Sequence, residues 1–159
     1  MTPIEPFFRT AGDGCGVICF HANASSSNQW RSLMERLSED YRVFAPDSYG
    51  AAKTPPWGGS QPLTLADEVD LIEPLLLRAK PPLALVGHSY GGAIALIAAL
   101  RHPEKVRALA LYEPTLFSLV DAEAPPPNAA DGIRTTVATV TRALEAHDPN
   151  AAAECFIDY

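Results

Sequence analysis

Short runs of consecutive apolar residues recur along the chain, and each ends at a polar or glycine-containing corner. The clearest runs cover residues 16–21, 41–47, 81–88 and 105–114. Apolar residues are continuous in these runs and do not alternate with polar ones, which is typical of parallel strands covered on both faces. The pattern therefore predicts four strands of a largely parallel sheet, the last of which ends where Pro114 blocks its continuation.

Segments with helical spacing lie between the predicted strands. Residues 25–40 and 64–80 carry apolar side chains three and four positions apart, whereas residues 91–102 are apolar on nearly every side. The first two should be amphipathic helices, and the third should be buried against the sheet. Right-handed crossovers between alternating strands and helices place helices on both faces of the sheet. We therefore predict an α/β protein with a three-layer αβα arrangement and a mostly parallel sheet.

The character of the sequence changes after the fourth predicted strand. Residues 119–132 form a connector rich in proline and alanine, residues 132–148 have the spacing of another amphipathic helix, and nothing resembling a strand follows until the last five residues. The strand at 105–114 would then be an unpaired apolar edge, which invites pairing with another chain. We expect further strands, supplied by a C-terminal segment or by a second chain, to complete the sheet.

Charge and composition narrow the partners that this chain can have. The 159 residues include 12 lysines and arginines against 19 acidic residues, without any basic cluster, so we expect no nucleic acid partner. The chain shows neither a secretory pattern at its N-terminus nor an apolar run long enough for a membrane helix, which favours a cytoplasmic protein without membrane contact. The odd set of Cys15, Cys19 and Cys155 predicts reduced packing residues.

A single serine, Ser89, stands in the sequence GHSYG between a predicted strand and the apolar helix that follows. This G-x-S-x-G spacing, with Gly87 and Gly91 beside a tight turn, lifts a serine hydroxyl clear of the backbone at a helix N-terminus. There, free N–H groups and the helix dipole stabilise a developing oxyanion. The alternative is a glycine-rich nucleotide loop, but the segment contains neither G-x-G-x-x-G nor G-K-[ST]. We therefore predict a serine nucleophile, with no cofactor and no metal.

With this motif and three further segments, the chain resembles the α/β-hydrolase fold family, in its small-molecule esterase, perhydrolase and carbon–carbon hydrolase branch. HANASSSNQW at 21–30 looks like the oxyanion loop, with Ala22 where glycine is usual, and residues 45–55 and 106–117 resemble the next loop and the entry to the cap. The resemblance implies that residues 1–118 are the N-terminal part of the hydrolase core and that 119–159 begin the cap or lid.

The resemblance also implies roles for particular residues. The backbone N–H groups of Asn23 and Tyr90 would form the oxyanion hole. His21 would line the pocket and organise its loop rather than transfer protons, and Asp47 would form a turn. Four further side chains would either line the pocket or belong to the plain core: Tyr49, Trp57, Leu116 and Phe117.

A serine hydroxyl needs a base, which in this fold follows the nucleophile and the acid in the chain. Only His102 and His147 follow Ser89. His102 stands at the far end of the helix that starts beside the nucleophile, roughly 20 Å away at 1.5 Å per residue, and His147 closes the cap helix. We therefore expect the catalytic histidine to lie beyond residue 159. Glu113 is a candidate acid, with pocket lining or support of the cap hinge as its alternatives.

Two functions remain open at this point. The first is a serine hydrolase for small, largely apolar esters, or for related acyl or carbon–carbon substrates. The second is a non-catalytic ligand-binding or interaction module of the same fold that has lost its triad. The retained Ser89 and oxyanion loop favour the hydrolase, whereas the missing base favours the module.

Overall fold

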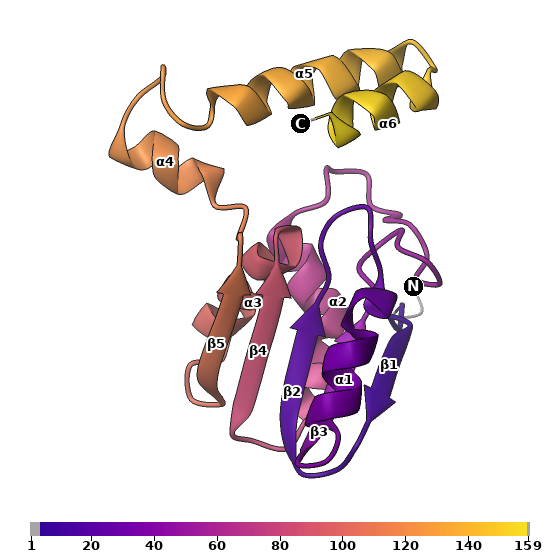
Figure 1. Cartoon of the computed structure of the whole chain (residues 1–159), viewed down its shortest axis with the longest axis vertical. Helices are drawn as coiled ribbons and strands as arrows, with labels where there is room; N and C mark the ends of the chain where they lie inside the picture. Colours follow the sequence, from indigo (N-terminus) through magenta and orange to yellow (C-terminus); the bar gives the residue numbers. More distant parts are fainter. Residues whose placement is uncertain (1–3, 159) are drawn as a thin grey trace. The chain divides into compact units, whose positions relative to one another are not determined.

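The chain divides into two units, with the boundary between Thr115 and Leu116. A five-stranded sheet forms the centre of the first unit. The computed structural model describes residues 4–158. The strands are β1 (Phe8–Ala11), β2 (Cys15–Phe20), β3 (Tyr41–Pro46), β4 (Leu83–His88) and β5 (Val106–Tyr112). Their order across the sheet is β1-β3-β2-β4-β5, with β1 antiparallel to β3 and the other neighbours parallel (Figure 1).

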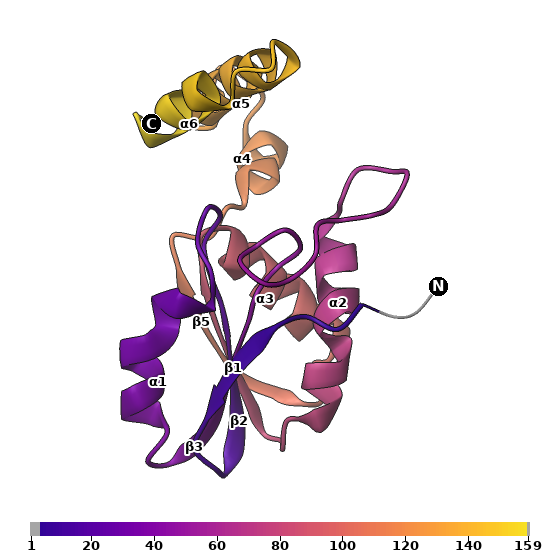
Figure 2. The ribbon, with the colours of Figure 1, turned by 90° about the vertical axis from the view of Figure 1, so that its right-hand side faces the viewer.

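Helices cover both faces of this sheet (Figure 2). One face carries α1 (Arg31–Leu37), preceded by the 3-10 turn η1 (Ser27–Trp30), and the other carries α2 (Leu65–Arg78) and α3 (Tyr90–Arg101). The predicted three-layer α/β architecture is therefore confirmed. The carboxyl ends of β2, β3 and β4 lie at the same end of the sheet. The loops that contain the predicted site residues leave from that end (Figure 1).

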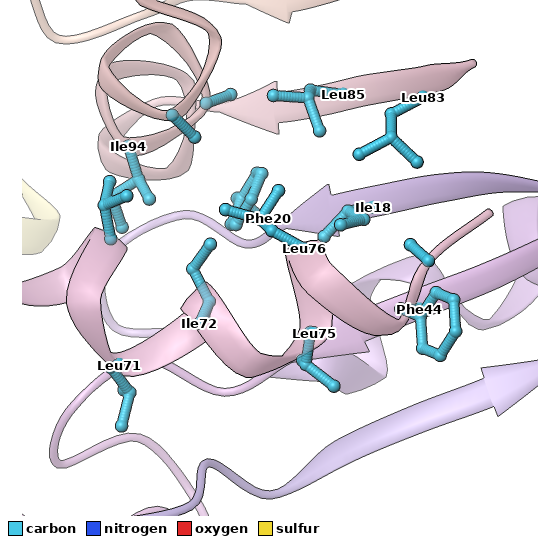
Figure 3. Close-up of a cluster of buried hydrophobic side chains, with 14 residues drawn as sticks. Ile18, Phe20, Phe44, Leu71, Ile72, Leu75, Leu76, Leu83, Leu85 and Ile94 are labelled. Carbon is cyan, nitrogen blue, oxygen red and sulfur yellow. The ribbon is translucent and has the colours of Figure 1, made fainter. Parts of the chain in front are cut away.

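The main core lies between the sheet and α2. Ile72 and Leu76 of α2 pack with Ile18 of β2 and Leu85 of β4, and each of these side chains is at most 3% exposed (Figure 3). Thr64 begins the helix in a reciprocal capping box with Asp67, which satisfies two N–H groups at the helix start. Together these contacts hold α2 firmly against the sheet, beside the loops at the carboxyl end of the strands.

A smaller core lies on the other face and contains Cys19, Met34 and Val43. Burial raises the pKa of the Cys19 thiol to about 12, so this thiol stays protonated and packs as an apolar group. Cys15 and Cys155 are free as well.

Several predicted elements differ from the observed ones. The sequence analysis missed β1, whose four residues pair only with β3, and it predicted one helix over 25–40 where η1 and a shorter α1 occur. The fourth predicted strand, β5, is largely exposed and forms the edge of the sheet among residues 4–158, in agreement with the apolar edge expected from the sequence. Leu109 and Tyr112 of β5 are 37% and 62% exposed.

The second unit is helical. It contains α4 (Phe117–Glu123), α5 (Asp131–Glu145) and α6 (Pro149–Ile157), of which α5 and α6 pack on each other. Helix α5 matches the helix predicted over 132–148, whereas α4 occupies part of the predicted connector and α6 was not predicted. Arg134 holds the unit's first half together through 2.7 Å ion pairs to Asp121 and Asp131.

Candidate active site

The turn between β4 and α3 gives Ser89 a backbone conformation that non-glycine residues rarely adopt. Its φ is 52° and its ψ is −119°, and a strained conformation of this kind costs on the order of 1–3 kcal/mol. The Ser89 N–H donates to the carbonyl of Tyr112 at 2.9 Å, and the Ser89 carbonyl accepts from the N–H of Thr115 at 3.2 Å. These bonds to Tyr112, the last residue of β5, and to Thr115 in the segment that follows hold the serine at the N-terminus of α3.

Two glycines make this tight turn sterically feasible. A Cβ atom on Gly91 would overlap the carbonyl oxygens of Phe20 and His21, and one on Gly87 would overlap the backbone of Gly91. Because these neighbours are backbone atoms, no side chain can move aside to make room. The start of α3 therefore approaches the end of β2 more closely than any residue with a side chain would allow.

The two predicted oxyanion donors keep their backbone N–H groups available to a ligand. Tyr90 is the first residue of α3 and Asn23 lies in the exposed loop after β2, and neither N–H donates a hydrogen bond to any residue from 4 to 158. By contrast, the N–H of Ala22 donates to Oε1 of Gln29 at 3.0 Å. The positive end of the α3 dipole adds to the attraction of an anion at this position.

His21 has both ring nitrogens occupied by the backbone. Nδ1 lies 2.7 Å from the carbonyl oxygen of Ala22, and Nε2 lies 3.1 Å from the N–H of Ser48. Since a carbonyl only accepts and an amide N–H only donates, His21 is neutral with its proton on Nδ1. The side chain, 3% exposed, joins the loop after β2 to the loop after β3.

Asp47 also joins separate segments of the chain by hydrogen bonds. Its side chain is fully buried and accepts a 2.6 Å hydrogen bond from the N–H of Ser27, while its carbonyl accepts one from the hydroxyl of Thr54 at 3.0 Å. The hydroxyl of Thr54 in turn accepts from the N–H of Phe7. Asp47 therefore fixes the loop after β3 against η1.

A cavity of about 600 Å³ opens beside these loops, a volume suited to a small molecule. Its lining includes Asn23 and Tyr90, which are the predicted oxyanion donors, together with His21, Ser48, Tyr49 and Glu68. Of the other predicted pocket residues, Trp57 is not part of this lining but packs edge-on against Tyr49, with ring centroids 5.1 Å apart. Leu116 and Phe117 belong to the second unit.

Glu68 is a buried carboxylate in the wall of this cavity. It is 2% exposed, and its two oxygens accept hydrogen bonds from the N–H of Tyr49 at 3.3 Å and from the hydroxyl of Tyr90 at 3.4 Å. Burial raises the pKa of Glu68, and the two hydrogen bonds offset part of that effect. Burial and the nearby Glu68 also raise the pKa of the Tyr90 phenol, which therefore remains a donor.

None of the remaining titratable candidates among residues 4–158 forms a hydrogen bond with the Ser89 side chain. His102 ends α3 and lies 3.0 Å from a carboxylate oxygen of Glu73, and His88 accepts from the amide of Gln29 at 3.0 Å. Glu113 is exposed just after β5, with a φ of 46°. His147 follows α5 in the second unit.

The sequence analysis did not single out Gln29 and Glu68. Gln29 joins the Ala22 N–H to the ring of His88 and so braces the loop that carries Asn23. Glu68 did leave a signal in the sequence, because it falls between Leu65 and Ile72 on the apolar stripe of α2. An acidic residue on a buried stripe is costly unless it has a structural or functional partner.

Two further features of the described residues bear on other functions. No group of three or more histidine, cysteine, aspartate or glutamate side chains in residues 4–158 is arranged to hold a metal ion. Over the same range, the helices are all too short or too polar to cross a membrane.

Comparison with known proteins identifies the family. Residues 17–153 match the family model for the alpha/beta hydrolase fold. The chain is 33% identical over 108 residues to a pimeloyl-[acyl-carrier protein] methyl ester esterase of Aliivibrio fischeri, covering 68% of this chain and 39% of that protein. It is 30% identical to the lipase LipV of Mycobacterium tuberculosis, covering 84% of this chain and 52% of the lipase. This chain belongs to the α/β-hydrolase fold family.

Solved structures agree on the fold. An epoxide hydrolase from Bacillus megaterium superposes with a TM-score of 0.72 at 19% identity, covering 84% of this chain and 49% of that one. The chain thus spans between about two fifths and one half of the length of these relatives.

Proposed function

We propose that this chain carries the nucleophile and the oxyanion hole of a serine hydrolase that acts on small esters or on related acyl or carbon–carbon substrates. The observation that carries the proposal is Ser89, held at φ 52° and ψ −119° at the N-terminus of α3. Strain is retained at a position where the surroundings enforce it, and such positions cluster at catalytic sites. The similarity to an esterase and a lipase supports the same class of reaction.

In the proposed reaction, the Ser89 hydroxyl attacks the substrate carbonyl, whose oxygen becomes an oxyanion. The N–H groups of Asn23 and Tyr90 donate to that oxyanion, and their lack of other acceptors among residues 4–158 supports the role. A histidine takes the serine proton and passes it to the leaving group. Because His21, His88 and His102 have other partners, we propose that this histidine comes from outside residues 1–159.

The exposed edge strand supports a second part of the proposal. β5 presents Leu109 and Tyr112 to solvent, and a long apolar edge of this kind is normally paired or covered. We propose that a further segment or a second chain pairs with β5 and carries the histidine. Residues 1–159 alone should then hydrolyse nitrophenyl esters near background, because a triad without its base keeps only the contribution of the oxyanion hole and binding.

The test compares serine variants in the full-length protein. Ser89→Ala should lower nitrophenyl ester turnover by about 10³-fold or more, whereas Ser48→Ala, which removes a hydroxyl from the cavity wall, should remain within a few-fold of the parent. Full activity in Ser89→Ala would refute the proposal. Absence of turnover in every full-length variant would favour the non-catalytic binding module, and ordinary turnover by residues 1–159 would make His147 the base.

A further inference from the structure

Glu68 is the one carboxylic acid in the cavity lining, and the proposed reaction does not use it. It projects from α2 at a position that belongs to the buried face of the helix, next to Val69 and Ile72. The carboxylate accepts from the backbone N–H of Tyr49 and from the hydroxyl of Tyr90, and each contact occupies one acceptor site. An ionised carboxylate offers about four such sites, so about two remain for a ligand.

No cation among the described residues offsets this carboxylate. The cavity lining contains neither lysine nor arginine. The nearest basic residue in the loop sequence, Lys53, places its ammonium group over the ring of Phe7, 4.6 Å from the centroid. Arg78, at the C-terminal end of α2, pairs with Glu5, and Arg101 of α3 pairs with Asp70.

His21 does not supply a positive charge either. Both of its nitrogens are bonded to the backbone in a pattern that only the neutral ring can satisfy, so protonation would break the bond from the Ser48 N–H. The neighbouring carboxylate of Asp67 adds negative charge near the same wall. The cavity is therefore electronegative, with its charge buried at Glu68.

We propose that this cavity binds the cationic part of a small substrate, an ammonium or alkylammonium group that pairs with Glu68 beside Tyr49 and Tyr90, both of which line the cavity. Aromatic rings attract cations through their faces, and a desolvated carboxylate attracts them more strongly than an exposed one does. A substrate with a carboxylate in this place would meet no partner and would be repelled by Glu68. The inference rests on the proposed function only in calling the ligand a substrate.

Binding can be tested without catalysis. Choline and 3,3-dimethylbutan-1-ol have the same shape, but only choline is charged. Titration of each into the protein by calorimetry should give at least about tenfold tighter binding of choline, equivalent to about 1.4 kcal/mol. Glu68→Gln keeps the size of the side chain and should reduce this ratio to about twofold or less. Glu35→Gln makes the same substitution at an exposed position of α1, on the other face of the sheet, and should leave the ratio unchanged (Figure 2).

A ratio near one in the parent protein, or a ratio that survives Glu68→Gln in a folded variant, would overturn the inference. Thermal unfolding shows whether each variant is folded. If Glu68→Gln does not fold, the ratio of choline affinity to 3,3-dimethylbutan-1-ol affinity, compared between the parent and Tyr49→Leu, decides instead. Tyr49→Leu removes one aromatic ring and should weaken choline binding more than binding of the alcohol.

Hydrolysis by the full-length protein separates this inference from the proposed function. If nitrophenyl acetate is hydrolysed, choline should inhibit competitively at lower concentration than 3,3-dimethylbutan-1-ol. Hydrolysis without preferential inhibition by choline would overturn the cation site alone. Preferential choline binding in a protein that hydrolyses no ester would support the site and contradict the hydrolase.

Discussion

Replacing Ser89 with glycine should stabilise the protein while removing the proposed nucleophile. The serine holds a φ of 52° and a ψ of −119°, which costs on the order of 1–3 kcal/mol for a residue with a Cβ atom. Glycine adopts this conformation readily but loses about 0.5–1 kcal/mol more backbone entropy on folding. Relief of strain should prevail, leaving Ser89→Gly more stable than Ser89→Ala by roughly 0.5–2 kcal/mol.

The comparison with Ser89→Ala isolates the backbone effect, because both variants lack the hydroxyl and differ only in the Cβ atom. Urea unfolding followed by circular dichroism measures the difference, and a gain of 1 kcal/mol would raise the melting temperature by about 3 °C. Equal stability of the two variants, or a less stable Ser89→Gly, would show that the turn is not strained and would refute this reasoning.

Three further predictions concern the framework of the site. Gly91→Ala should destabilise by about 2–3 kcal/mol or prevent folding, since its Cβ would overlap backbone oxygens, as urea unfolding would show. Asp47→Asn should destabilise by about 1.5–3 kcal/mol, by the same measurement, through the weakened bond to Ser27. Because burial raises the pKa of Glu68 above its ordinary 4.5, stability should fall as pH rises through that raised value; Glu68→Gln should lack this fall in a pH series of melting curves.

The sequence predicted the parts of the site that local sterics determine. G-x-S-x-G between a strand and an apolar helix leaves few backbone arrangements, and the structure places Ser89 in a positive-φ turn at the start of α3. The three-layer fold was predictable for a similar reason, because continuous apolar runs need cover on both faces.

The parts that depend on distant contacts were not predictable from the sequence alone. The short strand β1 carries only four residues and gains its place by pairing with β3. The cavity role of Glu68 arises because the loop after β3 and the first residue of α3 meet its carboxylate from two directions. Neither contact has a counterpart in the local pattern around α2.

The most direct test of the proposed serine chemistry is covalent labelling of the full-length protein with a fluorophosphonate, followed by peptide mass spectrometry. We predict a single adduct on Ser89, which is absent in Ser89→Ala and retained in Ser48→Ala. An unlabelled but folded parent protein, or an adduct on a different serine, would contradict the assignment of Ser89 as the nucleophile.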